Sequence, residues 1–537
     1  MKKKLLFLVI LFSVFIGNAQ PPTVGMLYHD ANVSEGFTLF SPLRNNEVFL
    51  INPCGEKVNQ WTFTEVPGAT CYLLNNGNLL RAGRDNLQIR DWNNNIVWSY
   101  PTTANGILQH HDITPLPNGN VLCIVSDSYT LAEMTTAGRN PAITSASFKL
   151  EKIIEIQPIG ANSAAIVWEW KFKDHLVQDF DATKSNYGVV QNRPELLDIN
   201  YANGSLTDYL HCNGIDYNAS RDEIIISARH LNEIYIIDHS TTTAQAASHS
   251  GGNSNKGGDF LWRWGNPQVY RQGTEANRKL FLQHNPMWVE NGYLDAGKIS
   301  VFSNGEANSA QQVSSVLLVN PEISNNAYTM TNAIFNPPTY DWFWSGSILG
   351  VVFLQDRQSG TQSLPNGNII ISEALLGRVS EITKTGTLLW SYKNPTGIYT
   401  NPTTVYYPQF TTIPANVNGV FKAEKYPPNF PGFVGHSMTP MGTIENTNSL
   451  SIACSSLGTS DFNSQNLFVL EPVKNNLIQF STTINADNIS IFDTNGRKVF
   501  SENSFSGNEI NVTLNPSLYI LKIQSETAEK TIKLLIQ

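Results

Sequence analysis

The chain has 537 residues, of which 41% are hydrophobic and 15% are charged, and its formal net charge is −9. A chain this long exceeds the roughly 250–300 residues at which a single hydrophobic core stops growing, so more than one domain is expected. The acidic balance, together with the lack of a basic stripe interleaved with aromatic residues, argues against nucleic acid as a partner.

The first residues have the three parts of a secretory signal peptide. Lys2–Lys4 form a basic start, Leu5–Ile16 form an apolar run, and Gly17–Ala19 are the small residues of a cleavage site. The apolar run is too short for a bilayer, which takes about 20 residues. We therefore predict that residues 1–19 are a signal peptide and that the mature chain has no transmembrane segment. The alternative is a short membrane anchor.

A repeat with strand-like features follows. An Asn-Gly-Asn turn inside an apolar stretch occurs at 76–78, 118–120 and 366–368, and each copy leads through further alternating stretches to a tryptophan. Such a unit is typical of a four-stranded antiparallel meander. One sheet of this kind cannot bury both of its faces, whereas copies stacked radially can, as in a β-propeller.

The number of strands that end in tryptophan gives the number of repeat copies. Tryptophans close six strands, where their large apolar surface is expected to fill the space between neighbouring sheets. These are Trp61, Trp98, Trp168 with Trp170, Trp262 with Trp264, Trp342 with Trp344, and Trp390. We predict an all-β chain with a six-bladed β-propeller over residues 21–462.

Several stretches interrupt the repeat. Residues 126–148, 172–208 and 240–258 are polar and irregular, and we expect them to form loops on a face of the propeller. Residues 397–462 are rich in proline, asparagine and threonine, and we expect them to wrap the propeller before a linker.

The last part, 466–537, alternates as short strands, with an Asn495-Gly496 hairpin signal. This pattern predicts a small β-sandwich of the Ig-like kind. The segments 491–499, 518–523 and 530–536 resemble the C-terminal sorting domain of the bacterial type IX secretion system. The resemblance implies passage through the periplasm, contact with that secretion machinery, and then release or attachment at the outer cell surface.

The five cysteines show no metal-binding spacing. None of Cys54, Cys71, Cys123, Cys212 and Cys454 forms a CxxC pair, so neither a zinc nor a redox site is expected. Export permits a disulfide, for which Cys54 and Cys71 are the nearest pair. We predict no metal and no cofactor.

Three histidines occupy one phase of the repeat. His111 and His284 each lie eight residues before a turn glycine, and His211 enters its strand in the same way. The starts of the innermost strands of a propeller lie near its axis, so these imidazoles are predicted to converge there. The alternative is that each caps a turn or bonds a neighbouring blade. The neighbouring polar residues, as rim or supporting groups, are His110, Asp112, Arg229 and His230.

The segments that contain these residues also resemble a known family. His110–Asn120, Ser227–Ile234 and Phe421–Tyr426 are similar to the bacterial arylsulfate sulfotransferases. The resemblance implies a six-bladed periplasmic propeller that moves sulfate between phenols without a nucleotide cofactor. It also implies a histidine nucleophile, assisted by further histidines and an arginine.

The chain departs from this family at two points. Ser359 stands where the nucleophile is expected, and residues 302–309 lack the expected arginine. His211 and His284 match the sulfate-binding histidines best, and His111 or His284 is the candidate to replace the nucleophile.

Two functions follow. The first is a sulfotransferase with an aryl sulfate donor and a phenolic acceptor, whose catalytic residues are His111, His211 and His284. Its substrate-binding residues are Arg229, His230, His110 and Asp112. The second is a non-catalytic propeller that binds an anionic or carbohydrate ligand. Activity as another kind of hydrolase or as a lyase is a further alternative. A quinone-dependent dehydrogenase is disfavoured, because the sequence shows neither the residues that contact its cofactor nor a cluster of calcium ligands.

Overall fold

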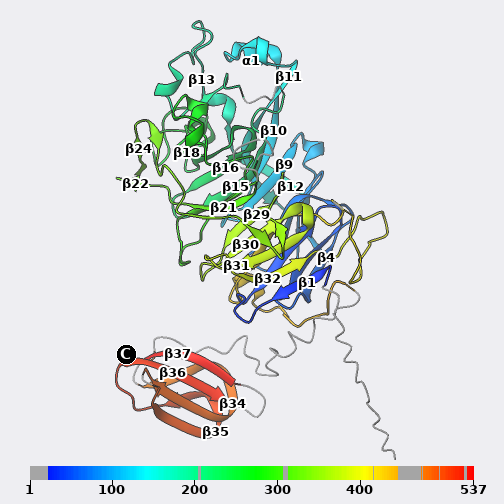
Figure 1. Cartoon of the computed structure of the whole chain (residues 1–537), viewed down its shortest axis with the longest axis vertical. Helices are drawn as coiled ribbons and strands as arrows, with labels where there is room; N and C mark the ends of the chain where they lie inside the picture. The colour runs from blue at the N-terminus through cyan, green and yellow to red at the C-terminus, as the bar shows by residue number, and fades with distance from the viewer. Residues whose placement is uncertain are drawn as a thin grey trace, which may run out of the picture. The chain divides into compact units, whose positions relative to one another are not determined.

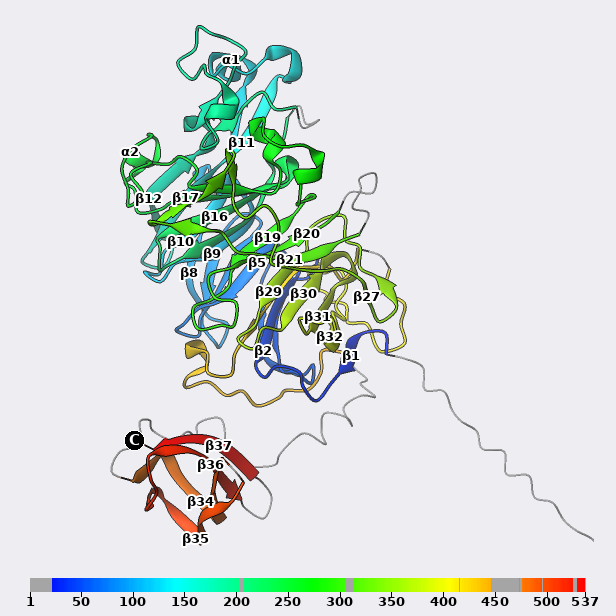
Figure 2. The ribbon, with the colours of Figure 1, turned by 60° about the vertical axis from the view of Figure 1, so that its left-hand side comes forward.

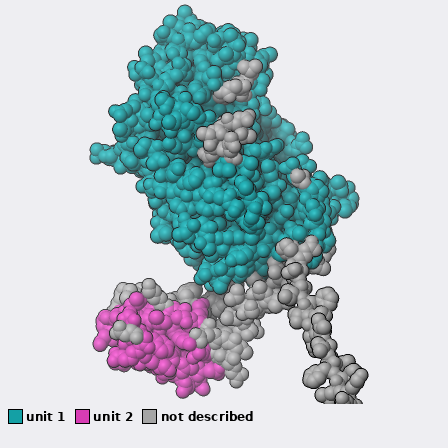
Figure 3. Space-filling model, viewed as in Figure 1, with its two compact units in different colours: residues 1–448 teal, residues 449–537 magenta. Residues whose placement is uncertain are grey.

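The computed structural model describes residues 22–202, 207–305, 313–414, 416–445, 473, 476–494, 496–524 and 529–536. The chain divides into two compact units, 1–448 and 449–537, which Figure 3 colours separately. The predicted signal peptide lies outside the described residues.

The first unit contains six antiparallel four-stranded sheets, the blades of a propeller. From the inside outwards, the first three blades are β33 (Val420–Tyr426), β2 (Phe37–Pro42), β3 (Glu47–Ile51) and β4 (Lys57–Thr62); β5 (Pro67–Leu73), β6 (Leu79–Gly83), β7 (Leu87–Arg90) and β8 (Ile96–Tyr100); β9 (Gln109–Pro115), β10 (Val121–Thr130), β11 (Ser147–Ile159) and β12 (Ser163–Lys171). The other three are β15 (Cys212–Asn218), β16 (Glu223–Ala228), β17 (Glu233–Asp238) and β18 (Trp262–Trp264); β19 (His284–Trp288), β20 (Ile299–Ser303), β21 (Ser315–Val319) and β26 (Trp342–Trp344); β29 (Gly360–Ser363), β30 (Ile369–Glu373), β31 (Arg378–Ile382) and β32 (Leu388–Lys393), with β1 (Gly25–His29) added outside β32.

Short elements decorate the blades. The short strand pairs are β13 (Leu176–Val177) with β14 (Leu197–Asp198), β22 (Ile323–Ser324) with β23 (Ala327–Tyr328), β24 (Met330–Thr331) with β25 (Ile334–Phe335), and β27 (Ser347–Ile348) with β28 (Val351–Val352). The helices are α1 (Leu131–Thr136) and α2 (Thr243–Ala246), and the 3₁₀ turns are η1 (Thr103–Asn105), η2 (Pro141–Ile143), η3 (Phe172–Asp174), η4 (Val190–Asn192), η5 (Arg229–Leu231), η6 (Pro267–Tyr270), η7 (Glu275–Asn277), η8 (Ala374–Leu376) and η9 (Pro431–Phe433).

The sheets close into a ring. The innermost strands contact one another in the order β33, β5, β9, β15, β19, β29 and back to β33. Figure 2 shows four of these strands, β5, β9, β19 and β29, in the middle of the unit, and Figure 1 also shows β15. The predicted all-β class and six-bladed propeller are confirmed.

The ring is closed by a strand from the far end of the unit. β33 pairs with β2, so that Glu424 lies opposite Leu39 in the first blade. The expectation that residues 397–462 wrap the propeller before a linker is therefore wrong for 420–426, which form the innermost strand of the first blade. Every residue of β33 is buried, including Lys422 and Glu424. The strand therefore lacks the alternation of apolar and polar residues that marks a half-buried strand.

The blade-closing tryptophans join each blade to the next. Each of the six lies in the fourth strand of its blade, counted from the axis, and donates its indole N–H to a backbone carbonyl that precedes, or opens, the fourth strand of the following blade. The pairs are Trp61 and Asp91 (2.8 Å), Trp98 and Ser163 (2.8 Å), Trp170 and Gly258 (2.7 Å), Trp262 and Asn336 (2.7 Å), Trp342 and Lys384 (2.9 Å), and Trp390 and Pro53 (2.7 Å).

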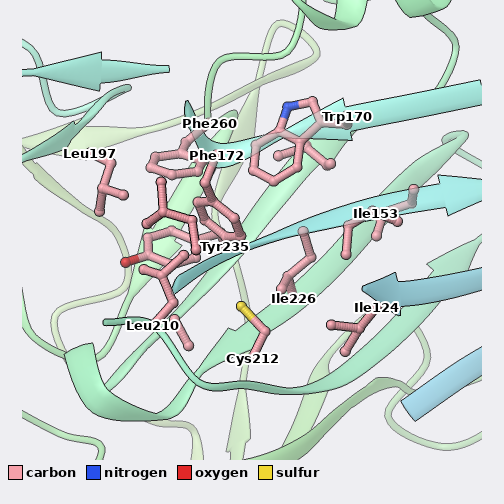
Figure 4. Packing of buried hydrophobic residues seen from close by; sticks show 14 of the residues in the cluster. Ile124, Ile153, Trp170, Phe172, Leu197, Leu210, Cys212, Ile226, Tyr235 and Phe260 are labelled. Atoms are coloured by element: carbon pink, nitrogen blue, oxygen red, sulfur yellow. The ribbon is translucent and has the colours of Figure 1, made fainter. Parts of the chain in front are cut away.

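Apolar side chains fill the spaces between blades. The largest cluster lies between the third and fourth blades, where Trp170 and Phe260 contact each other (Figure 4). Cys212 points into this cluster beside Ile226, and it is fully buried. Its packing anchors the start of β15, directly after His211.

The C-terminal unit is a small β domain with its own core. Its strands β34 (Leu477–Asp493), β35 (Lys498–Asn511), β36 (Ser517–Gln524) and β37 (Glu529–Ile536) form one sheet in the order β35-β34-β36-β37. The sheet curls, because Val473 bridges Ile536 on one edge strand while Leu477 pairs with Asn511 on the other. Where the sequence predicted two facing sheets, a single curled sheet encloses the core.

Cysteine pairing differs from the expectation. Cys71, Cys123 and Cys212 are free and buried, whereas Cys54 is disulfide-bonded. The proposed pairing of Cys54 with Cys71 is therefore wrong. Among the described residues, no helix has the length and apolar character needed to cross a membrane.

Candidate active site

His111 and His211 meet at the centre of the ring. His111 lies on β9 and His211 directly precedes β15, and their Nε2 atoms are 3.1 Å apart. Residues one hundred positions apart are thus brought into contact by the two adjacent innermost strands, as the shared repeat phase predicts.

A common backbone feature aims these side chains. On β9 and β10, Ile113 pairs with Cys123 and Gln109 pairs with Val125. The three β9 residues between these pairs, His110 to Asp112, therefore lie opposite a single β10 residue, Ile124. Similar irregularities interrupt the starts of β5, β15 and β19. Such β-bulges re-aim side chains and often border functional sites.

Left-handed backbone accompanies the bulges of β9, β15 and β19 and also occurs directly before β29. The φ angles are +58° at His111, +52° at His211, +50° at Asn285 and +80° at Ser359, all in non-glycine residues. This conformation is costly and persists where the surrounding structure enforces it. The turn-glycine spacing therefore located this strained conformation at His111 and Ser359, and it located His284 one residue before it.

Asp208 supports His211 from the other side. His211 Nδ1 lies 2.6 Å from Asp208 Oδ2, which fixes Nδ1 as the donor and directs Nε2 towards His111. Burial raises the pKa of Asp208, but the bond and charge of His211 outweigh it, so the pKa lies below its ordinary value. The sequence did not single out Asp208, because it does not lie eight residues before a turn glycine.

His230 and His110 complete the cluster. His230 Nδ1 donates to the backbone oxygen of Asp208 over 2.7 Å, and its ring centre is 4.8 Å from that of His211. The ring of His110 is centred 4.3 Å from that of His111, and its Nδ1 is 3.4 Å from the buried carboxylate of Glu151. The His cluster, as we call it below, comprises His110, His111, His211 and His230 with Asp208.

The cluster favours neutral imidazoles. Burial, followed by the charges of His110 and His211, holds the pKa of His111 well below its usual value. Burial also lowers the pKa of His230. At neutral pH both rings are therefore uncharged, and each has a nitrogen lone pair.

The cluster is also compact enough to gather around one ion. Ligand atoms of His110, His111 and His211 lie within 4.8 Å of one another, and so do those of Asp208, His211 and His230. The same closeness suits proton transfer along the chain from Asp208 to His111.

His284 lies beside the cluster but is already satisfied. Its Nδ1 is 2.7 Å from Asn304 Oδ1, and its Nε2 accepts the backbone N–H of Gln358 at 3.1 Å. Burial lowers its pKa to about 3, so the ring is neutral. The ring of Phe421, from β33, contacts both His111 (5.8 Å between centres) and His284 (6.0 Å).

Arg229 provides positive charge beside the cluster. It begins η5, directly after β16, and its Nη2 donates to the backbone oxygen of Asp356 at 3.4 Å, in the loop before the sixth blade. Its charge contributes to the lowered pKa values of His111 and His284. The positive charge of this guanidinium would therefore attract an anion bound in the cluster.

Asp112 and Ser359 are both buried and held by neighbouring residues. Asp112 is fully buried and pairs with Lys422 and Tyr72, an arrangement that favours a supporting role over substrate contact. Ser359 is also fully buried, and its Oγ accepts the backbone N–H of Ala374 at 3.1 Å, so its hydroxyl is not presented as a nucleophile.

Two family models match the chain. Residues 69–334 match the family described as Arylsulfotransferase (ASST), a stretch that contains the whole His cluster and His284 but not Ser359. Residues 471–537 match the family described as Secretion system C-terminal sorting domain. No curated protein sequence matches the chain.

Solved structures resemble the chain with low identity. A protein of unknown function from Bacteroides caccae is 11% identical, with a TM-score of 0.36 over 73% of this chain and 98% of that one. A virginiamycin B lyase from Staphylococcus aureus is 9% identical (TM-score 0.30; 68% and 87%). The Cps50 (Swd1) β-propeller domain of Myceliophteria thermophila is 8% identical (TM-score 0.36; 69% and 90%).

The secretion model places the chain among proteins sent to the exterior or the outer cell surface. The two family matches also agree with both resemblances that the sequence motifs suggest. The chain therefore combines an arylsulfotransferase-family domain with the C-terminal sorting domain of the type IX secretion system.

Proposed function

We propose that the propeller transfers a sulfuryl group from an aryl sulfate to a phenolic acceptor at the His cluster. The observation that carries this proposal is the 3.1 Å contact between the Nε2 atoms of His111 and His211, with Asp208 behind His211. A nucleophile, a base in contact with it and a group that orients the base are the parts that covalent catalysis requires.

The first half of the reaction uses His111. The His111 nitrogen that does not face His211 attacks sulfur, so an N–S bond forms, the S–O bond to the aryl group breaks, and the phenolate leaves with the electron pair. The Nε2 proton of His111 then passes to Nε2 of His211. The resulting imidazolium is stabilised by Asp208, whose carboxylate already accepts the Nδ1 hydrogen bond.

The second half reverses the sequence with a new phenol. The acceptor oxygen attacks sulfur, the N–S bond breaks, and the phenolic proton goes to a neutral imidazole of the cluster, for which His230 has its Nε2 available. The proton on His211 returns to His111. Arg229 is placed to stabilise negative charge on the sulfuryl oxygens.

A second candidate is binding of a sulfate-like anion without turnover. Two observations favour it: both ring nitrogens of His284 are occupied, and Ser359 stands where the family nucleophile is expected. This propeller would hold its ligand between the cluster and Arg229 and would form no covalent intermediate.

One assay separates the candidates. The secreted protein is incubated with p-nitrophenyl sulfate and a phenol acceptor, and nitrophenolate release and sulfated acceptor are both measured. We expect acceptor-dependent release that falls at least about 10²-fold in His111→Ala and His211→Ala, the scale of a lost catalytic group. The control His29→Ala alters an imidazole on the outer strand β1 and leaves the rate unchanged.

Anion binding without release in the unmodified protein would establish the second candidate. Release that is insensitive to both cluster substitutions would place the chemistry elsewhere.

A further inference from the structure

A second group of imidazoles lies outside the His cluster. His175 follows η3 at the end of the third blade, His249 lies in the segment after α2, and Asp259 precedes β18 of the fourth blade. Two separate connections thus meet at one carboxylate, the one after β12 and the one between β17 and β18. His175 is fully buried, and the side chain of His249 is 55% exposed.

Both ring nitrogens of His175 face hydrogen-bond acceptors. His175 Nε2 lies 2.8 Å from the backbone oxygen of Ala246, so this nitrogen carries a proton, since a carbonyl only accepts. His175 Nδ1 also faces an acceptor, because Asp259 Oδ1 is 2.8 Å away. His249 Nδ1 approaches the same oxygen at 2.7 Å.

Two arrangements satisfy these contacts. In one, His175 is an imidazolium fully buried beside Asp259. In the other, His175 and His249 are neutral, and their Nδ1 lone pairs converge with the carboxylate on a cation. The second arrangement avoids a buried cationic ring. It also uses the bond from His175 Nε2 to the Ala246 oxygen, since a metal-ligating histidine ordinarily donates its other ring N–H to a carbonyl or carboxylate.

The surroundings fix the buried ring. The indole of Trp170 stacks on His175 with 5.4 Å between centres and 7° between planes, and its Nε1 donates to the Gly258 oxygen. A Cβ at Gly258 would lie 2.6 Å from both His175 Nε2 and Trp170 Nε1, so only glycine fits here. One ligand is thus rigid, while the exposed His249 leaves a path for a metal to enter.

From this geometry we propose that His175, His249 and Asp259 bind a divalent transition metal, of which Zn²⁺ is the probe. The three ligand atoms lie within 4.8 Å of one another. Two imidazole nitrogens and one carboxylate oxygen suit zinc, with a fourth position left for water. Ligand atoms bound to a tetrahedral zinc at about 2.0–2.1 Å lie roughly 3.3 Å apart, so the contacts of 2.8 and 2.7 Å to Asp259 would widen by about half an ångström on binding. The ion would tie the 243–259 connection to the third blade.

A nearby histidine provides a matched control. His239 lies between two carboxylates, Asp222 at 2.7 Å and Glu155 at 3.0 Å, with no second imidazole on either of them among the contacts described. These bonds raise its pKa despite burial, as expected of an imidazolium held by two anions. His239 is thus satisfied without a metal.

The test is zinc binding by the chelator-stripped, full-length secreted protein. Because the His cluster could also take zinc, the background is a His111→Ala/His211→Ala protein, in which competition with a chromophoric chelator counts the remaining sites. We expect one Zn²⁺ per chain, weakened at least tenfold by His249→Ala and unaffected by His239→Gln. Since His249 is exposed, its replacement does not threaten folding, and Asp259→Asn gives an independent loss.

Co²⁺ adds a readout specific to coordination. We expect visible absorption typical of four-coordinate Co²⁺ with nitrogen and oxygen ligands in the background protein and none in His249→Ala. Equal zinc binding with and without His249, or no binding at 100-fold excess over micromolar protein, would overturn the proposal and leave the buried imidazolium. Neither result depends on sulfotransferase activity.

Discussion

Lys422 lies 3.2 Å from Asp112, so the strand that closes the ring is joined to the residue that follows His111. Both side chains are almost fully buried, and the Tyr72 hydroxyl bridges them at 2.6 Å from Lys422 and 2.9 Å from Asp112. Burial lowers the pKa of Lys422, but Asp112 and Glu424 outweigh it and raise the pKa, so the ammonium stays charged.

Removing this ammonium should destabilise the propeller. Lys422→Met leaves the Asp112 carboxylate buried without its counter-ion, and the expected loss is about 3–5 kcal/mol, as for other broken buried pairs. The double variant Lys422→Met/Asp112→Asn should recover part of it. Chemical unfolding of the propeller, followed by tryptophan fluorescence, measures both. Additive effects of the two substitutions would show that the residues are not coupled.

Asp208→Asn tests the support of His211. The variant keeps a hydrogen-bond acceptor but loses the charge that stabilises an imidazolium, so we expect turnover to fall about 10²-fold with little change in KM. Steady-state assays with p-nitrophenyl sulfate measure this. Asp222→Asn, which alters the partner of His239, is the control. A turnover within twofold of the unmodified protein would remove Asp208 from the mechanism.

His284 predicts a pH dependence of stability. Its folded pKa of about 3 lies below the ordinary 6.5, so between these values the unfolded chain binds more protons and stability falls as the pH decreases. At pH 5 the expected cost is about 2 kcal/mol relative to pH 7.5, since one pKa unit corresponds to about 1.4 kcal/mol. His284→Gln keeps a donor and an acceptor without titrating, and should lose correspondingly less. Identical pH profiles of unfolding would contradict this.

Trp390→Phe tests the link between the last and first blades. The variant retains most of the apolar contact but loses the hydrogen bond to the Pro53 oxygen, and we expect a loss of about 1–2 kcal/mol. Trp390→Ala should cost about 3–5 kcal/mol, because it also opens a cavity. Thermal unfolding monitors both. Equal losses in the two variants would assign the whole effect to the hydrogen bond.

Much of the fold could be predicted because its determinants are local. Each blade ends in a tryptophan that fills the gap to the next sheet, so counting these residues counts blades. The phase of His111 was predictable for a similar reason, since the turn glycine lies at a fixed distance from the bulged strand start. His211 was predictable only from the similar start of its strand.

The rest depends on contacts that no local pattern marks. β33 is buried on both faces and carries Lys422 and Glu424 in a polar interior, so it lacks the alternation of a strand. Asp208 lies in an irregular insertion. His175 comes from one connection and His249 and Asp259 from another, at a spacing that matches no metal-binding motif, and only the packing of two blades brings them together.

Ring closure by β33 also sets the order in which the molecule becomes complete. Strand β2 is synthesised early, but its blade lacks the innermost strand until residues 420–426 have been added. Phe421 covers His111, and Lys422 holds Asp112, so the last strand to arrive also forms a wall of the candidate site. A chain whose synthesis stops short of this strand could form most blades and still have no finished site.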